Sequence, residues 1–557
     1  MSGQGIAIVG LSCLFPDAEG PRQFWQSLLA GRDSSSEITA AELGFDPQAI
    51  FSAARGTRDA TYWLRGSYVR GFQLTAEGFR LAPELIASLD QQAQWILHLA
   101  REALSDAGLW DPGAPLNRCG LVLGNLSFPT RASRRTYSDM YTADLEAELR
   151  ELLGRADLQL PRVPRRPGET AADTLLEGSI AGRVGQVLGA GGPCFSIDAA
   201  CASSLYAVKL ASDYLLAGQA DVMLAGALSC ADPLFINMGF SIFQAYPDAD
   251  GGSRPLDGTS GGLLAGEGAG LFVLKREADA MRDGDRVYAV VRGVGLSNDG
   301  RGKHLLTPNS KGQVLAMQRA YAAAGLTPAE VDYVECHATG TPVGDVVELD
   351  SMSQVFEGEA PPIGSVKSNL GHLLTAAGMA GMIKMTLAMH EGIIPATINV
   401  DQPISSHDGR VGGSAVVRSA REWPQRGPVK KAGVNAFGFG GSNAHLILSE
   451  PVGAPAGGDS VGKLPRMAIT GMGAHAGRCD SLAALEAALY DGRQQVRDLP
   501  PTRWRARCEQ APRGAYLEDF EFDFLRFGVP PQSDGAPIPQ QLLVLTVADE
   551  AIRDAQL

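Results

Sequence analysis

Short apolar runs alternate with longer segments of helical periodicity along most of the chain. Residues 6–10 and 119–123 are runs of apolar and small side chains, a pattern typical of buried strands. Residues 89–107 repeat apolar side chains at helical spacing instead. The alternation continues through strand-like or helical segments at 222–227, 287–296, 314–324, 333–336 and 379–389. This pattern predicts an α/β fold.

The alternation is interrupted twice. Residues 131–174 are rich in Arg, Glu and Pro without strong periodicity, so we expect a surface excursion with a helix over 144–153. Residues 451–465 are dense in Gly, Pro and Ala and have no hydrophobic period, which indicates a linker. We therefore expect residues 1–450 to form the first domain.

The sequence after this linker repeats the start of the chain. The matching segments keep their order along the chain: 467–473 with 6–12, 516–520 with 68–72, and 549–555 with 101–107. A strand-like run, an aromatic pair and a helical segment therefore recur in succession. We predict that residues 466–557 are the incomplete N-terminal part of a second copy of the first domain.

One cysteine stands at the junction of a predicted strand and a predicted helix. Cys201 follows strand-like residues 195–198, and apolar side chains then recur at helical spacing up to a stop at Gly218. Unpaired N–H groups at a helix N-terminus favour a thiolate, and can bring a cysteine pKa from about 8.5 to roughly 3.5–7.5. The position favours a nucleophile. The alternative is a buried structural cysteine, which is the commoner state in an apolar chain.

Two histidine motifs and a glycine-rich loop favour the interpretation of Cys201 as a nucleophile over that of a structural cysteine. His337 lies in ECHATGTPVGDVVE at 335–348, and His372 ends GSVKSNLGH at 364–372. Both motifs follow strand-like segments and are rich in small residues, as expected of loops that bring side chains to one cleft. The glycine-rich loop is NAFGFGGSN at 435–443. Together with the cysteine, these loops predict a site of nucleophilic catalysis.

Composition argues against several other classes of protein. The net charge of −14 disfavours a nucleic-acid-binding surface, and no run of about 18 or more apolar residues indicates a membrane span. Eight cysteines without CxxC or Cys/His ligand spacing predict neither disulfides nor a metal site, and no secretory signal starts the chain. We therefore expect a cytoplasmic protein. The segments 266–270 and 438–441 lack the GxGxxG spacing of a dinucleotide site.

The cysteine, the two histidine motifs and the glycine-rich loop, in this order, resemble the β-ketoacyl synthases (ketosynthases) of the thiolase-like superfamily. The resemblance covers residues 5–450. It implies a thiolase-like fold, layered α-β-α-β-α with two pseudo-repeated halves. It also implies an acyltransferase that joins malonyl and acyl groups by decarboxylative Claisen condensation. No cofactor is then expected to be bound for the chemistry, because the phosphopantetheine arm of an acyl carrier protein delivers the substrates.

The resemblance assigns a role to each central residue. Cys201 would carry the acyl chain as a thioester. His337 and His372 would stabilise the oxyanion that forms when the malonyl group loses CO2. The backbone N–H groups of Cys201 and Phe439 would form the oxyanion hole for the tetrahedral intermediate.

A buried ion pair is a further implication of the resemblance. Lys367 lies in the second histidine motif, and Glu348 is its expected partner. The pair would orient the neighbouring loops. Many fatty-acid-type family members carry a Glu fourteen residues after this Lys, whereas Gly381 stands there in this chain. The partner of Lys367 therefore stays open.

Substrate-binding residues follow from the resemblance as well. Thr339 and Thr341 match positions that bind the pantetheine arm in the family. Phe439, with Phe437, matches the gate between the acyl pocket and the pantetheine tunnel. From the sequence pattern alone, a phenylalanine at either position could equally belong to the core.

Three stretches look most like the third-subunit ketosynthase of bacterial polyunsaturated fatty acid synthases: 198–206, 231–241 and 296–303. In that subunit a ketosynthase is followed by a chain length factor, an order that agrees with the linker and the incomplete repeat. The implied partners are an acyl carrier protein, a chain length factor domain or a second copy in a dimer, and other subunits of a multienzyme synthase. Related iterative polyketide or glycolipid synthases are the nearest alternatives.

Two functions of other classes were weighed against this one. A non-catalytic chain-length partner lacks the nucleophile, so Cys201, His337 and His372 together argue against it for residues 1–450. The same role stays open for the second, incomplete domain. A thiolase-like enzyme without decarboxylation is disfavoured because two histidines, rather than a second cysteine, accompany the nucleophile.

Overall fold

The structure is a computed structural model of the 557-residue chain. It describes residues 5–79, 82–112, 114, 116–126, 128–162, 180–248, 251–300, 307–424, 426–452, 467–500, 512–517, 520–529 and 538–557. Most of the predicted linker at 451–465 lies outside these residues. None of the helices in the described ranges is long and apolar enough to cross a membrane.

An eleven-stranded sheet organises the larger of two compact units, which comprises residues 1–143 and 157–463. Ten strands follow the order β11-β10-β14-β15-β9-β1-β8-β7-β5-β6, and β2 (Ala18–Glu19) pairs with β1. The bounds of the ten are β1 Ile6–Phe15, β5 Cys119–Gly124, β6 Cys194–Ile197, β7 Val222–Ser229, β8 Gly268–Arg276, β9 Ala289–Asn298, β10 Tyr333–Glu335, β11 Ile363–Gly364, β14 Lys431–Phe437 and β15 Ser442–Ser449.

The strand order contains the same topology twice. When β1, β5, β6, β7 and β8 are numbered one to five, their spatial order is 3-2-4-5-1, and β9, β10, β11, β14 and β15 have the same order. In each half the second strand is parallel to the third and the fourth, and the fourth is antiparallel to the fifth. The halves meet where β1 pairs with β9. The two pseudo-repeated halves are therefore confirmed.

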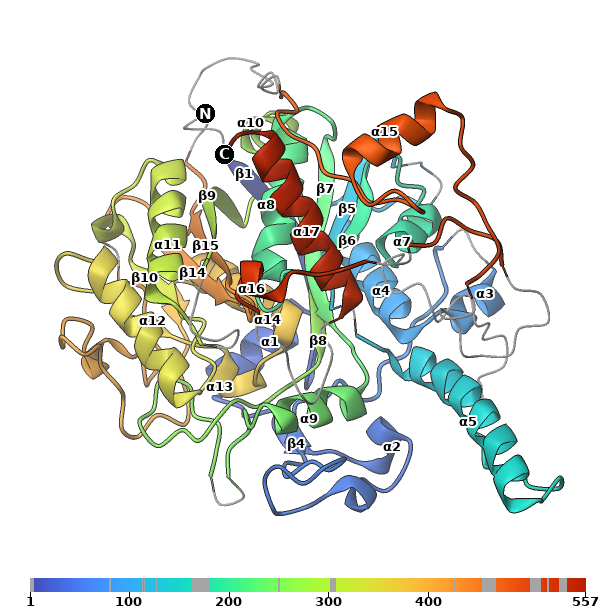
Figure 1. Ribbon diagram of the computed structural model, residues 1–557. Helices are drawn as coiled ribbons and strands as arrows, with labels where there is room; N and C mark the ends of the chain where they lie inside the picture. The colour runs from blue at the N-terminus through green and yellow to red at the C-terminus, as the bar shows by residue number, and fades with distance from the viewer. Residues whose placement is uncertain are drawn as a thin grey trace. The chain divides into compact units, whose positions relative to one another are not determined.

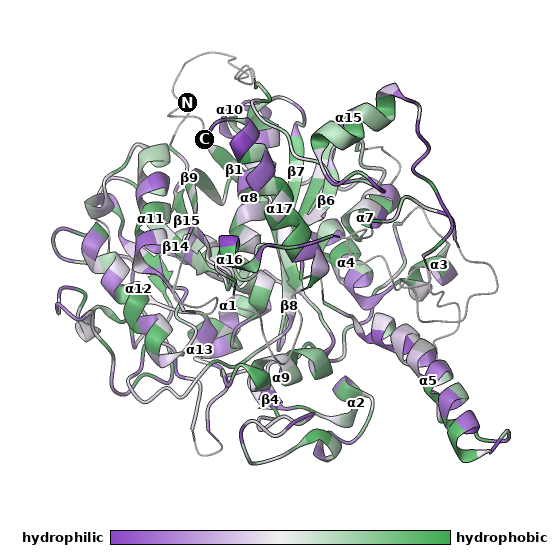
Figure 2. Cartoon of the chain, viewed as in Figure 1, coloured by the Kyte–Doolittle hydropathy of each residue, from purple (hydrophilic) through white to green (hydrophobic). Residues whose placement is uncertain are grey.

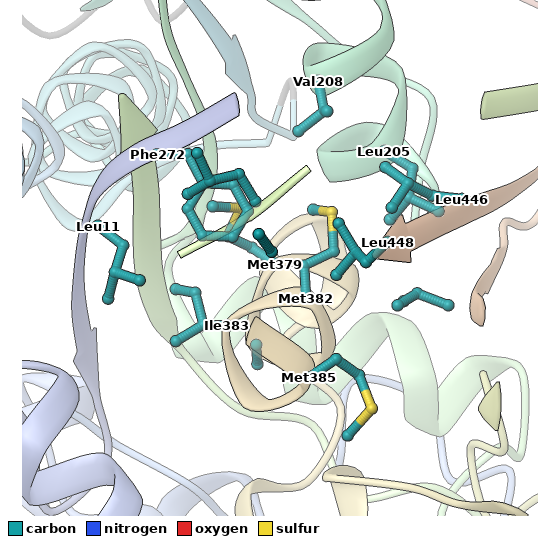
Figure 3. Close-up of a cluster of buried hydrophobic side chains, with 14 of the residues drawn as sticks. Leu11, Leu205, Val208, Phe272, Met379, Met382, Ile383, Met385, Leu446 and Leu448 are labelled. Carbon is teal, nitrogen blue, oxygen red and sulfur yellow. The ribbon is translucent and has the colours of Figure 1, made fainter. Parts of the chain in front are cut away.

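Helices form a central layer and two outer layers around these strands (Figure 1). In the central layer, α8 (Ser203–Leu216) and α14 (Ala377–Glu391) share one core with strands of both halves, as the cluster in Figure 3 shows. α4 (Gln91–Asp106) and α7 (Ile180–Leu188) pack on one outer face. α11 (Ser310–Ala324) and α12 (Pro342–Val355) pack on the other. This is the expected α-β-α-β-α layering.

The apolar composition of α14 explains its central position. All residues from 377 to 389 are buried, and they are nearly all apolar or small, so the helix has no face suited to water. The outer helices α11 and α12 instead alternate hydrophilic and hydrophobic residues (Figure 2). One charged side chain, Lys384, is nevertheless fully buried on α14. A buried charge of this kind needs a partner of opposite charge.

The smaller unit comprises residues 144–156 and 464–557. Its described helices beyond residue 464 are α15 (Leu482–Tyr490), α16 (Phe524–Phe527) and α17 (Pro539–Asp554). Gly471 approaches α17 as Gly10 approaches α4, because a Cβ on either glycine would collide with a carbonyl oxygen of the helix. The next N–H donates to an aspartate of that helix in both units: Leu11 to Asp106 at 3.0 Å and Met472 to Asp554 at 2.9 Å. This local likeness supports the predicted repeat.

The helix in the predicted surface excursion is longer than expected. It was predicted over 144–153, and α5 spans Arg131–Leu153, a helix of 23 residues. Its apolar residues do not gather on one face, so periodicity could not predict its length. Residues 144–156 group with residues 464–557 in the smaller unit.

Candidate active site

A strained turn presents the cysteine between β6 and α8. Ala200 has a positive φ of 50°, which is unfavourable for a residue with a Cβ, and Cys201 follows two residues before α8 begins. Ser203 fixes the turn, since its Oγ accepts from the Ala199 N–H at 2.8 Å and donates to the Ala200 carbonyl at 2.6 Å. Cys201 is only 6% exposed. The turn therefore holds the sulfur inside the protein.

His372 contacts the sulfur directly. Its Nε2 lies 3.1 Å from Cys201 Sγ, while its Nδ1 accepts from the Leu374 N–H at 3.2 Å. In the uncharged ring an accepting Nδ1 leaves the proton on Nε2, so Nε2–H donates toward the sulfur. Burial, together with the charge of Lys367, holds the pKa of His372 well below its usual value. The residue is a neutral hydrogen-bond donor.

His337 lies beside His372 as a second neutral imidazole. The two ring centroids are 5.4 Å apart with the planes nearly perpendicular, and the Phe437 ring packs 5.8 Å from His337. Burial and the charge of Lys367 hold the pKa of His337 well below its usual value. Its Nδ1 is buried and has no hydrogen-bond partner. A buried polar atom without a partner at such a site is available to substrate.

Glu348 holds the His337 loop by its backbone rather than by pairing with Lys367. Its carboxylate accepts the N–H groups of His337 and Ala338, both at 2.7 Å, and the Asn435 side-chain amide at 2.7 Å. No ion pair joins it to Lys367 within 4.0 Å, although both side chains are described and buried. Glu348 is nevertheless the carboxylate that most raises the pKa of Lys367, so the two groups interact by charge without a contact. The loop that carries His337 begins at the end of a strand, where backbone N–H groups have no partner in the sheet. The Glu348 carboxylate accepts their hydrogen bonds.

Lys367 affects the site through its charge, which shifts the pKa of the neighbouring groups. Burial lowers the pKa of Lys367, and the carboxylates of Glu348 and Glu335 raise it. Its positive charge in turn lowers the pKa of Cys201 and of both histidines. Lys367 thus keeps the imidazoles uncharged and makes a thiolate less unfavourable.

The pKa expectation for the nucleophile is also wrong for the closed site. Burial raises the pKa of Cys201 to about 11. The charge of Lys367 and the backbone N–H groups of Phe439 and Cys201 oppose that increase but do not reverse it. The sequence indicated the helix N-terminus correctly but could not indicate how completely the sulfur is removed from water.

The glycine-rich loop supplies one of the backbone N–H groups beside the sulfur. The N–H groups of Cys201 and Phe439 both face Sγ, which is where an oxyanion hole for the acylated cysteine would need them. Gly438 fits closely, because a Cβ there would lie 2.8 Å from the Ala199 carbonyl oxygen. Phe439 is 39% exposed, with its ring 6.4 Å from that of Phe240, whereas Phe437 is buried. The two phenylalanines therefore differ: one is mostly core and the other is at the surface of the loop.

A cavity of about 320 Å³ leads to this loop. Its lining includes Thr339, Thr341, His337 and Phe439, but neither Cys201 nor His372. The two threonine hydroxyls lie 2.9 Å apart and face the cavity. The cavity thus ends at His337 and the glycine-rich loop, and this loop separates it from the sulfur.

Three atoms of the site are of types that bind metals. One ligand atom each of Cys201, His337 and His372 lies within 4.8 Å of the other two. The sequence predicted no metal here. The positive charge of Lys367, which lowers the pKa of both imidazoles, also opposes a cation at this place.

Sequence reasoning missed two residues that support the site. Asn435 links Glu348 to His445, whose Nδ1 lies 2.6 Å from the Asn435 amide oxygen. Asp345 accepts the N–H groups of Gly340 and Leu256, and burial raises its pKa to about 7. Both residues stand inside the quoted motifs, so their positions within polar, glycine-rich loops were the available signal.

Profiles of one protein family match most of the chain. The profile described as "Beta-ketoacyl synthase, N-terminal domain" matches residues 4–280 and again 465–557, and "Beta-ketoacyl synthase, C-terminal domain" matches residues 288–401. The second N-terminal match covers the segment in which the sequence repeats.

Curated relatives include synthases of two kinds. The chain is 36% identical to a polyunsaturated fatty acid synthase subunit of Thraustochytrium sp., over 99% of this chain and 27% of that protein. It is 35% identical to the phenolphthiocerol synthesis polyketide synthase type I Pks15/1 of Mycobacterium marinum, over 80% of this chain and 20% of that protein. The chain thus spans about a quarter or less of the length of these relatives.

Solved structures share the fold. A PfaC ketosynthase–chain length factor is 46% identical with a TM-score of 0.93, over 100% of this chain and 60% of that one. The ketosynthase domain OzmH KS7 of Streptomyces albus is 28% identical with a TM-score of 0.66, over 80% of this chain and 75% of that domain.

Proposed function

The chain belongs to the β-ketoacyl synthase family, and from that premise we propose that it catalyses decarboxylative condensation of malonyl and acyl groups. The observation that carries the proposal is the environment of one sulfur. Cys201 Sγ faces His372 Nε2 at 3.1 Å and two backbone N–H groups, beside a second neutral imidazole. A nucleophile, an oxyanion hole and two uncharged donors are the groups that such a reaction needs.

The first step is acyl transfer to the cysteine. Sγ attacks the carbonyl carbon of an acyl thioester, and the backbone N–H groups of Cys201 and Phe439 stabilise the resulting oxyanion. The bond between this carbon and the sulfur of the carrier then breaks. The proton that leaves Cys201 balances the departing thiolate, which leaves as a thiol. Since the pKa of Cys201 is about 11 in the closed site, deprotonation accompanies attack rather than preceding it.

The second step is loss of CO2 from a malonyl thioester. The electron pair of the breaking carbon–carbon bond passes into an enolate, whose negative charge develops on the thioester oxygen. His372 Nε2–H is a neutral donor for that oxygen, and the unpartnered His337 supplies the second ring beside it. Neutral donors suit this step, because a charged imidazolium would bind the malonyl carboxylate and resist its loss.

The third step forms the new carbon–carbon bond. The enolate carbon attacks the thioester on Cys201, and the tetrahedral oxyanion again meets the two backbone N–H groups. Collapse expels the Cys201 thiolate, which takes up one proton. The products are a β-ketoacyl thioester and CO2, so the cycle consumes the proton that the balance requires.

Substrate delivery and partners extend the proposal. We infer that a phosphopantetheine arm of an acyl carrier protein enters the cavity past Thr339 and Thr341, with Phe439 as the gate. No bound cofactor takes part in these steps. The seven cysteines in the described ranges are unpaired, in accord with a reducing cytoplasm. Residues 466–557 would belong to a chain length factor domain that pairs with the active domain, or the chain would pair with a second copy.

The pathway assigned is polyunsaturated fatty acid synthesis. It is favoured by the relative and the solved structure whose matches span nearly the whole of this chain, including the repeated segment. Polyketide synthase relatives, which match 80–88% of the chain, support the alternative of an iterative polyketide or glycolipid synthase.

Two cysteine variants test the condensation directly. Cys201→Gln should release CO2 from malonyl carrier protein without forming product, because its amide resembles the acylated cysteine. Cys201→Ala should lose acyl loading and condensation. His372→Ala should reduce decarboxylation more than acyl transfer. Condensation by either cysteine variant would refute the assignment.

A further inference from the structure

The space beside Gly381 is occupied by a carboxylate from another element. Gly381 stands on α14 and has no side chain of its own there. A Cβ at Gly381 would lie 3.1 Å from Cγ of Glu335 and 3.9 Å from its Cδ. Glu335 ends β10 and is 1% exposed. The strand therefore places a buried carboxylate against the helix at the position where the helix has no side chain.

The carboxylate of Glu335 joins the two histidine segments. One oxygen accepts the N–H of Val366 at 2.5 Å, the residue directly before Lys367 in the turn that leads to His372. The other oxygen is 2.8 Å from Nζ of Lys384 on α14. Glu335 itself lies two residues before His337. A single side chain thus ties the strand end that carries one histidine to the turn that carries the other.

Lys384 is the charged partner of this carboxylate. The ion pair is fully buried, with side chains 0% and 2% exposed, and the Lys384 ammonium also lies 5.7 Å from the centre of the Tyr333 ring. An isolated charge at such a place would be strongly unfavourable, so each partner depends on the other. The negative charge reaches the site, because Glu335 is one of the two main carboxylates that raise the pKa of Lys367.

We infer that Glu335, paired with Lys384, is a positioning residue that sets the spacing of His337 and His372 and supports the charge of Lys367. The inference rests on the proposed function, since its effect is read in decarboxylation. It predicts that decarboxylation depends on this pair more than acyl loading does. Decarboxylation needs both imidazoles at one oxygen, whereas loading needs the sulfur and the backbone N–H groups.

The test compares Glu335→Gln with a matched control. Glu277→Gln removes a carboxylate that is likewise buried and ion-paired, but its partner is Arg292, which also donates to Ser449 rather than to either histidine segment. For each variant, CO2 release from malonyl carrier protein, acyl loading of Cys201 and the thermal unfolding midpoint are measured across pH. Glu335→Gln should lower CO2 release ten- to hundredfold and loading less than threefold. Glu277→Gln should change both rates equally and little.

The pH profile supplies a readout that a merely structural role would not move. Removing the Glu335 charge lowers the pKa of Lys367, so the alkaline limb of CO2 release should move to lower pH in Glu335→Gln and stay in place in Glu277→Gln. The double variant Glu335→Ala/Gly381→Glu removes the atoms that a side chain at 381 would meet and returns a carboxylate from the helix. It should recover at least a third of the wild-type CO2 release.

The outcomes separate the two proposals. A wild-type chain that releases no CO2 and loads no acyl group would refute the proposed function. An active wild type whose Glu335→Gln and Glu277→Gln variants lose both rates in the same ratio, with unshifted pH profiles, would overturn the positioning role alone. Failure of the double variant to recover, with its unfolding midpoint preserved, would also overturn it.

Discussion

Replacing Glu348 by glutamine should damage the site through the backbone of the His337 loop. The glutamate has two oxygens, of which one accepts from the His337 N–H and the Asn435 amide and the other from the Ala338 N–H, all at 2.7 Å. Glutamine keeps one oxygen and turns an N–H2 group toward the remaining donor. Asn435 cannot rotate to compensate without losing His445, whose Nδ1 lies 2.6 Å from its oxygen.

The magnitude follows from these contacts. One buried donor left unpaired costs about 1–3 kcal/mol, and two charge-assisted bonds weaken by about 1 kcal/mol each. Burial raises the pKa of Glu348, so a neutral side chain recovers part of that loss. The net decrease in the free energy of unfolding should be about 2–4 kcal/mol. If about half of it acts on the placement of His337, CO2 release from malonyl carrier protein should fall roughly five- to thirtyfold.

Urea unfolding and CO2 release measure the two effects. The control is Glu330→Gln, which also accepts a backbone N–H, that of Thr327 at 2.8 Å, but at an exposed helix start. Its cost should stay below about 1 kcal/mol without loss of activity. Should Glu348→Gln retain its rate within twofold and its stability within about 0.5 kcal/mol, the assigned hydrogen-bond role would be refuted.

Three further predictions follow from single features. Because the pKa of Cys201 is about 11, its alkylation by iodoacetamide at pH 8 should be roughly a hundredfold slower than that of a free thiol of pKa about 8.5. The alkylation rate should keep rising up to about pH 11. A rate that levels off below pH 8 would contradict this. Burial raises the pKa of Asp345 from 3.8 to about 7, so the folded state binds this proton more tightly and loses stability as the pH rises from about 4 to 7. Relative to Asp345→Asn, the free energy of unfolding of the wild type in urea should fall over this window by up to about 1.4 kcal/mol per pH unit. Parallel curves for the two proteins would disprove this. Gly438→Ala should slow acyl loading at least tenfold, because its Cβ would lie 2.8 Å from the Ala199 carbonyl oxygen. The control Gly358→Ala, whose Cβ would meet nothing within 4 Å, should load normally. Equal loading by the two variants would argue against the close fit of the glycine-rich loop.

Local pattern predicted the secondary structure near the site better than its electrostatics. The alternation of apolar runs and helices indicated the strands and the helix α14, and it placed Cys201 at the junction between β6 and α8. A helix N-terminus is a local feature, so the direction of its effect on a thiol could be predicted. Burial is not local. Cys201 is buried next to the core residue Ala202, and burial moves its pKa the other way.

The ion pairs show the same limit. The resemblance implied Glu348 as the partner of Lys367, and these two described side chains interact by charge without forming a contact ion pair. Glu348 binds backbone donors of its own loop, while the buried ion pair joins Glu335 of a strand to Lys384 of a helix 49 residues away in the sequence. Which charges meet depends on the packing of α14 against β10 and β14, and that packing is set by apolar residues rather than by the charges.

The central claim is that Cys201 carries the acyl chain. Mass spectrometry of the peptide containing Cys201, after incubation with an acyl-loaded carrier protein and then with malonyl carrier protein, tests it most directly. The account predicts an acyl mass on Cys201 that disappears as a β-ketoacyl thioester and CO2 are formed, and no adduct in Cys201→Ala. Product formation with Cys201 unmodified throughout, or with the acyl group on another cysteine, would contradict it.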